Sequence, residues 1–212
     1  EYRRPFGSFQ WISPHVSCVG EMVYVLLREC DVEITADIST NIMTSLIIES
    51  GAFRFPSVTA ETFELCARLM RSGVDYHDLI SRLYMSRLRE NVLLSGICLA
   101  RSQFAAHGKI VWSIIRMKDF NKIKGKDEDV DPVADEMRSI RGVKIAILFR
   151  EKDSDILRVS LRSKGRVNVA LLAEEYDGGG HFDVAGCFIK NSRSAIARFL
   201  GDAEPLAERG QI

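Results

Sequence analysis

Apolar residues recur at helical spacing through the first half of the chain. The stretch 18–28 has apolar side chains three and four positions apart, which is the period of one helix face. Thr35 and Thr59 precede two further stretches of this kind, at the position where a hydroxyl group commonly caps a helix. Gly73 follows the second of them, where glycine commonly ends a helix. Residues 75–104 contain no proline and predict two more helices, so this half is expected to be almost entirely helical.

After residue 108 the pattern changes to short apolar runs. Residues 109–117 are rich in β-branched side chains, and 143–150 and 156–161 are two more apolar runs on either side of a polar, turn-like stretch. Helical spacing returns between and after these runs, at 132–140, at 167–176 and from Ser192 or Ser194 onward. The second half therefore predicts strands alternating with helices.

The change of pattern divides the chain into residues 1–104 and 108–212. A chain of 212 residues with 46% apolar residues can bury a core, and its length suits one or two domains. The predicted fold class is α/β, with a helical N-terminal part followed by an α/β domain.

Charge and cysteine content limit the functions that the chain can have. Its 29 basic residues balance 29 acidic ones, so no bulk field attracts nucleic acid or a membrane, and any site for a polyanion must be local. No apolar run approaches the roughly 20 residues that a membrane helix needs. The five cysteines form no CxxC pair, which favours small buried side chains in a reducing compartment. We therefore expect a cytoplasmic protein without membrane contact.

The most distinctive motif is the loop Gly178-Gly179-Gly180-His181. Glycines have no Cβ and tolerate positive φ, so their N–H groups can approach a ligand and form a nest for phosphate oxygens. His181 adds a donor that can be charged near neutral pH. The loop alone is equally compatible with a flexible helix end followed by an ordinary histidine.

Basic residues gather in the predicted strand that precedes this loop. Between residues 141 and 170 there are eight basic and three acidic residues, an excess of five in a neutral protein. Arg158, Ser160 and Arg162 alternate with apolar residues, which puts them on one strand face. Arginine side chains suit phosphates, although each arginine taken singly is equally compatible with a solvated face. The strand and the loop together predict a phosphate site.

A second candidate position is Glu49, at the end of an apolar helix. A carboxylate there opposes the helix dipole, and a metal ion, a positive partner or simple exposure would each explain it. No HxxxH or HExxH pattern occurs, so a self-contained zinc site is not predicted.

Several segments resemble the DHH–DHHA1 phosphoesterases, particularly the small bacterial oligoribonuclease and pAp-phosphatase branch. Ser160–Ser163 followed by Gly178–Cys187 is similar to the substrate-binding signature of the DHHA1 domain. Ile48–Pro56 is similar to the last metal motif of the DHH domain, and 11–14 and 20–24 resemble the segment just after its Asp-His-His motif. The resemblance covers nearly the whole chain.

The resemblance implies a fold and a reaction. Residues 1–104 would be the helical part of a DHH domain and 108–212 a DHHA1 domain, with the substrate in a cleft between them. The implied reaction is hydrolysis of short oligonucleotides, or of nucleotides such as pAp, by a water activated by two manganese ions. Six positions match the family's substrate-binding residues: Arg162, Ser163, Asn168, Gly179, Gly180 and His181. Glu49 would be the one metal ligand in this chain.

The chain departs from the family in its metal motifs. It has no Asp-His-His triplet, and Arg3 lies near the place of an asparagine that usually follows the triplet. Glu49 stands where the family has aspartate, which moves the carboxylate by one methylene group. We therefore expect the C-terminal part of a family member that lacks most metal ligands.

Three hypotheses remain open. The first is a phosphoesterase or part of one, the second a non-catalytic nucleotide- or RNA-binding module, and the third a plain α/β interaction domain. A homodimer is also considered, because the N-terminal helices would expose apolar faces if an upstream sheet were missing.

Overall fold

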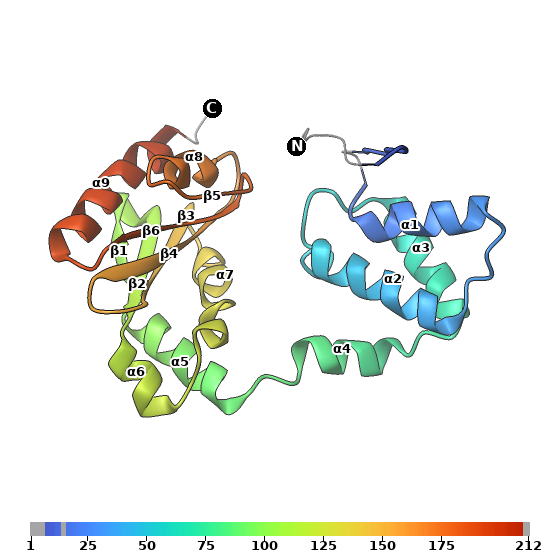
Figure 1. Cartoon of the computed structure of the whole chain (residues 1–212), viewed down its shortest axis with the longest axis horizontal. Coiled ribbons are helices and arrows are strands. Elements are labelled where there is room, and N and C mark those ends of the chain that lie inside the picture. The colour runs from blue at the N-terminus through green and yellow to red at the C-terminus, as the bar shows by residue number, and fades with distance from the viewer. Residues whose placement is uncertain (1–6, 14–15, 210–212) are drawn as a thin grey trace. The chain divides into compact units, whose positions relative to one another are not determined.

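The structure is a computed structural model that describes residues 7–13 and 16–209, apart from the side chains of residues 128, 129 and 209. Arg3 therefore lies outside the described residues. The chain divides into two compact units, Glu1–Ser86 and Arg87–Ile212. Figure 1 shows the helical first unit and the α/β second unit, which are described separately below.

The described residues of the first unit form four helices, as the apolar spacing predicts: α1 (Val19–Glu29), α2 (Ala36–Glu49), α3 (Ala60–Arg71) and α4 (Tyr76–Tyr84). Thr35 caps α2 by accepting a hydrogen bond from the Ile38 amide (3.3 Å), and Thr59 caps α3 through a capping box with Thr62. Gly73 follows α3 with a φ of 97°. The predicted caps and the glycine stop are thus confirmed. Fully buried side chains from α2 and α3 form the core: Met43, Leu46, Ile47 and Leu69.

The second unit is built on one six-stranded sheet with the order β1-β2-β3-β4-β6-β5. The strands are β1 (Gln103–Ala105), β2 (Ile110–Ile115), β3 (Ile145–Glu151), β4 (Ile156–Ser163), β5 (Gly179–Gly180) and β6 (Val184–Lys190). Only β2 and β3 pair in parallel, and the other neighbours are antiparallel. The predicted α/β fold class is confirmed. The sequence pattern missed β1 and β5 because two or three residues are too few to show a period.

Helices cover the two faces of this sheet unequally. On one face, α8 (Val169–Glu174) and α9 (Arg193–Arg209) enclose a core that includes Phe149, Leu161 and Phe199. On the other face, α5 (Arg89–Ala100) and α7 (Val133–Arg138) pack mainly over β2 and β3. The helix α6 (Met117–Ile123) and the 3₁₀ turns η1 (Ala106–Gly108) and η2 (Asp127–Val130) complete the unit. Helix α7 also contacts β4, so the second face is open mainly over β6 and around the exposed Arg158 of β4.

Helix α5 belongs to the α/β unit rather than to the helical half in which the sequence pattern puts it. The compact unit begins at Arg87, before the boundary expected at residues 104–108. Leu94 and Cys98 of α5 are fully buried in one cluster with Val111 and Leu148 of the sheet. Burying this apolar face on the sheet binds α5 to the second unit, and helix periodicity cannot tell which partner a helix has.

None of the described helices is both long and apolar enough to span a membrane. The cysteines are all free; Cys18, Cys98 and Cys187 are buried, whereas Cys30 is exposed. The expectation of small buried side chains therefore holds for most of the cysteines and is wrong for Cys30, which lies at the end of α1.

Candidate functional site

Alternate residues of β4 face two different environments. Leu157, Val159 and Leu161 are fully buried beneath α8 and α9. Arg158, Ser160 and Arg162 lie on the opposite, partly open face, as the alternation in the sequence predicts. On the neighbouring strands, Arg158 pairs with Arg150 of β3 and with Phe188 of β6.

A hollow with a volume of about 560 Å³ lies on this open face. Four of the six predicted substrate-binding residues line it: Arg162, Gly179, Gly180 and His181. Its other polar lining residues are Asp131, Arg150, Arg158 and Ser160. Its volume is in the range of about 300–1,000 Å³ that is usual for sites of small ligands. The fold thus brings the basic strand and the glycine loop together at one site.

The glycines in this loop are required chiefly by close packing between strands. A Cβ on Gly178 would lie 2.3 Å from the Gly186 carbonyl oxygen, and one on Gly180 would lie 2.4 Å from the Val184 carbonyl oxygen. Gly180 alone among the three has a positive φ, of 150°. No atom lies within 4 Å of the position that a Cβ on Gly179 would take, so the backbone there is open to a ligand.

Ser163 and Asn168 do not line the hollow. Ser163 is fully buried, and its hydroxyl donates to the Val167 carbonyl (2.6 Å). The Asn168 side chain caps α8 by accepting a hydrogen bond from the Ala170 amide (3.0 Å). Both side chains therefore hold the turn between β4 and α8 in shape.

The arginines of the open face are paired with carboxylates, which the charge count in the sequence did not anticipate. Arg162 Nε donates to Asp135 (3.1 Å), and Arg158 donates to Asp127 (2.8 Å). These aspartates belong to the stretch before β3, so the local basic excess is offset from outside the counted segment. A bound phosphate must therefore share these guanidinium groups with the carboxylates, and at Arg162 the Asp135 carboxylate takes only the Nε hydrogen.

Arg150 is a site residue that the sequence did not single out. Its side chain is 1% exposed and donates to Asp131 (2.6 Å) and to the Ser160 hydroxyl (2.7 Å). Its Nε is buried and has no hydrogen-bond partner. The sequence contains one signal for these ion pairs. Asp127, Asp131 and Asp135 are spaced four residues apart, as a row of carboxylates facing the arginines would be.

His181 and Cys187 both line this hollow, but they differ in the chemistry that they can offer to a ligand. His181 is exposed, and its backbone amide donates to the Val184 carbonyl (2.7 Å), which fixes the turn into β6. Burial raises the pKa of the Cys187 thiol to about 12. The thiol is therefore protonated at neutral pH and is not a thiolate nucleophile.

Glu49 lies exposed at the end of α2, in the first unit. The segment after it has three successive residues with positive φ, Gly51 (60°), Ala52 (57°) and Phe53 (62°). Such strained backbone commonly accompanies functional sites. The described part of the chain contains no group of three or more His, Cys, Asp or Glu residues that could hold a metal ion. These residues therefore do not supply the ligands that a two-metal centre requires.

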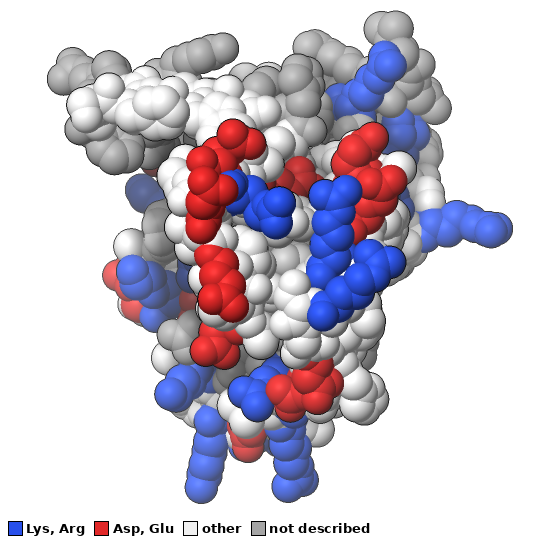
Figure 2. All heavy atoms as spheres, turned by 90° about the vertical axis from the view of Figure 1, so that its right-hand side faces the viewer, with Lys and Arg blue, Asp and Glu red and all other residues white. Residues whose placement is uncertain are grey.

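One face of the molecule shows both signs of charge side by side (Figure 2). On the face drawn in Figure 2, Lys and Arg side chains lie intermixed with Asp and Glu side chains. This agrees with the formal net charge of zero. Recognition of an anion must therefore be local to the hollow.

Comparison with known proteins agrees with these features. Residues 107–208 match the family model of the DHHA1 domain. The bifunctional oligoribonuclease and PAP phosphatase NrnA of Thermus thermophilus is 29% identical over 185 residues, covering 87% of this chain and 55% of that protein. The cyclic-di-AMP phosphodiesterase PdeA of Listeria monocytogenes is 24% identical, covering 88% of this chain and 28% of that protein.

A solved structure shows the same fold. An exopolyphosphatase-related protein from Bacteroides fragilis superposes with a TM-score of 0.89 at 21% identity, covering 98% of this chain and 63% of that one. The chain thus spans only part of the length of its relatives, 55% in the Thermus protein. Residues 107–208 are a DHHA1 domain, which supports the resemblance of the chain to the DHH–DHHA1 proteins.

Proposed function

We propose that this chain acts in the hydrolysis of phosphoesters in short oligonucleotides, or in nucleotides such as pAp, and that its DHHA1 domain binds the substrate. The observation that carries the proposal is the hollow of about 560 Å³ in which Arg162, His181 and the glycine strand meet. The names of the relatives, an oligoribonuclease and a cyclic-dinucleotide phosphodiesterase, agree with a nucleotide ligand.

In this proposal each residue has a defined task. Arg162, which Asp135 holds by a hydrogen bond of 3.1 Å, pairs with a phosphate of the substrate. His181 donates from its exposed imidazole, and the open backbone at Gly179 lets the phosphate approach closely. Asp135 thus keeps the guanidinium in one orientation and lowers the entropic cost of binding.

Manganese remains a proposal drawn from the family. Glu49 would be its ligand, and the strained backbone at Ala52 and Phe53 is the feature that marks this segment. The described residues contain no group of three or more His, Cys, Asp or Glu side chains that would complete such a metal site. A cytoplasmic location and a homodimer are proposals of the same kind, and gel filtration with light scattering tests the dimer.

The binding proposal is tested by calorimetric titration of the chain with pAp and with the dinucleotide pApA. His181→Ala and Arg162→Lys should each weaken binding by about ten- to a hundredfold, because a hydrogen bond to a charged phosphate contributes about 1.5–3 kcal/mol. Lys164→Ala removes an exposed charge at the end of the same strand, outside the hollow, and His77→Ala removes a histidine of the other unit. Equal losses in these controls, or none in any variant, would refute the assignment.

A second candidate function is nucleotide binding without hydrolysis. The observation that favours it is the absence of a metal-ligand cluster among the described residues. Incubation of pAp and pApA with the chain, with and without manganese, distinguishes the two. Release of phosphate or mononucleotide only with manganese supports the hydrolase, whereas binding that survives EDTA without turnover supports the binding module.

A further inference from the structure

A second hollow, of about 470 Å³, lies beside the first in the C-terminal unit. Arg158 and Phe188 line both hollows, so the two share a wall. The rest of the second lining includes Met117 and Asn121 of α6 and Lys152 after β3. Two carboxylates also line it, Glu151 and Asp127, and Asp127 forms an ion pair with Arg158 (2.8 Å). Neither the resemblance nor the predicted site residues account for this hollow.

The side chains around the second hollow suit a nucleotide. Phe188 is 53% exposed, and an aromatic ring can stack on any nucleobase. The Lys152 ammonium lies 5.3 Å from the centre of that ring, and Arg158 stands at the shared wall, so two cations are near the ring. Asn121 is exposed and offers amide donors and an acceptor to the edge of a base.

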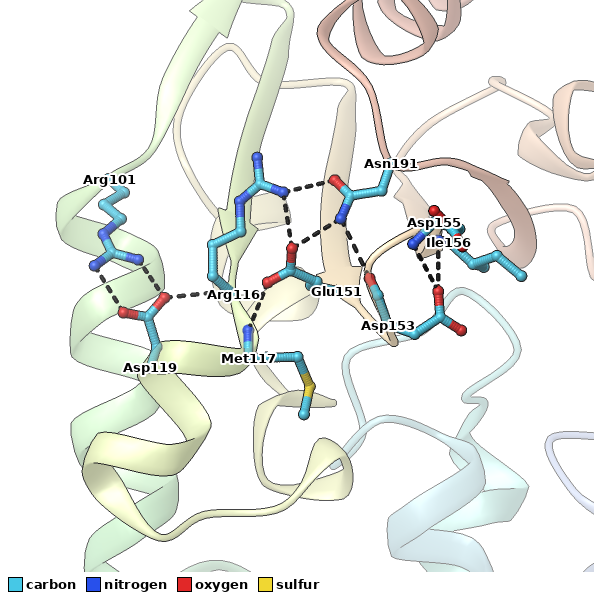
Figure 3. Close-up of polar contacts among 9 residues, drawn as sticks. All are labelled: Arg101, Arg116, Met117, Asp119, Glu151, Asp153, Asp155, Ile156 and Asn191. Carbon is cyan, nitrogen blue, oxygen red and sulfur yellow. Dashed lines mark hydrogen bonds and ion pairs between the residues drawn. The ribbon is translucent and has the colours of Figure 1, made fainter.

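The Glu151 carboxylate lines the second hollow and links the segments around it by hydrogen bonds. Figure 3 shows this carboxylate between Arg116, Met117 and Asn191. It accepts hydrogen bonds from the Met117 amide (2.8 Å), from Asn191 Nδ2 (2.8 Å) and from Arg116 (3.4 Å). Burial alone would raise the pKa of Glu151, but these donors outweigh it and lower the pKa. The hydrogen-bond donors around Glu151 therefore stabilise its negative charge.

The wall that α6 contributes is also fixed at its first turn. Asp119 forms a two-point ion pair with Arg101 and accepts a hydrogen bond from the Arg116 amide (3.0 Å), as Figure 3 shows. This holds the start of α6, from which Met117 and Asn121 extend to the hollow. A site whose walls are fixed before binding loses less conformational entropy when the ligand arrives.

We propose that the second hollow holds the second nucleoside of a short oligonucleotide whose first nucleotide occupies the first hollow. The base stacks on Phe188, and the linking phosphate lies at the shared wall near Arg158. This inference rests on the proposed function, because it assumes a nucleotide in the first hollow. With two such subsites, the chain binds a short oligonucleotide more tightly than a single nucleotide.

Calorimetric titration with AMP and with pApA tests the inference. We expect pApA to bind about tenfold more tightly than AMP, in line with stacking of one base. Asn121→Trp fills the second hollow with a large side chain and should reduce the affinity for pApA to that for AMP, while AMP binding stays unchanged. Lys122→Trp puts the same side chain on the next residue of α6, outside the lining, and should leave both affinities unchanged.

The outcomes separate this inference from the proposed function. Equal binding of AMP and pApA, with no effect of Asn121→Trp, would overturn the second subsite and leave the first hollow as the nucleotide site. Equal weakening of both ligands by Asn121→Trp would overturn it as well, because the hollows would then not be separate subsites. Binding of neither ligand would overturn the proposed function and the inference together.

Discussion

The two faces of β4 are made by alternate residues of one strand, yet they have different physical roles. Val159 and Leu161 are fully buried under α8 and α9 in an apolar core. Arg158 and Arg162 are the sequence neighbours of these two residues, yet they line a polar hollow and form ion pairs with aspartates. Because successive side chains of a strand point to opposite faces, one face of β4 contributes to stability and the other lines the hollow.

The largest effect should come from the closed face. Leu161→Ala is expected to lower the free energy of unfolding by about 2–5 kcal/mol, because it removes a fully buried side chain and leaves a cavity. Arg158→Ala on the open face should cost less than about 1 kcal/mol, because its ion pair with Asp127 is half exposed. Urea unfolding followed by circular dichroism measures both values. Equal losses would contradict the division of roles between the faces.

A smaller effect should distinguish two adjacent glycines of the loop. Gly180→Ala is expected to lower the free energy of unfolding by about 1–3 kcal/mol, because a Cβ there meets the Val184 carbonyl at a φ of 150°. Gly179→Ala has open space and should change the stability little, while its methyl group weakens nucleotide binding at the hollow. Thermal unfolding and calorimetric titration of both variants check this. A stable Gly180→Ala protein would show that the strand contact is not close.

The smallest effect should appear in acid and should come from the carboxylates beside the open face. The Asp119 pKa is lowered from its ordinary value of 3.8, chiefly by the hydrogen bond from Arg101, and the Glu151 pKa is lowered from 4.5. A lowered folded-state pKa stabilises the folded protein above the unfolded-state pKa. We therefore expect this contribution in full at neutral pH and its progressive loss as the pH falls below about 4.5 and through the folded-state pKa values.

Urea unfolding between pH 7 and pH 3 measures this loss. Asp119→Asn should be less stable at pH 7 and should depend less on pH below 4.5, because one of the carboxylates with a lowered pKa is gone. Lys122→Gln, which removes a charge from the same helix without being a cause of the Asp119 shift, serves as the control. The same pH dependence in Asp119→Asn as in the unaltered chain would contradict the assignment.

The extent to which the sequence predicts the molecule differs between its parts. Helical spacing and the Thr35 and Thr59 caps are local, so the first unit follows from the pattern. The alternation in β4 correctly put Arg162 on a polar face, and Gly179 and His181 were found with it because their motif is contiguous. Ser163 matched the motif as well, but its hydroxyl serves the turn before α8, and only the fold shows that.

The sequence by itself determined most of the elements, the neutral overall charge and the resemblance to the DHHA1 domain, because these depend on local periodicity, composition and motif spacing. The tertiary structure decided which elements pack together: it joined α5 to the sheet, set three aspartates against the arginines of β3 and β4, and buried Arg150. It also set α6 beside Phe188 to form a second hollow next to the glycine loop. These outcomes depend on which surfaces bury each other across long separations in the chain, and no local period encodes that choice.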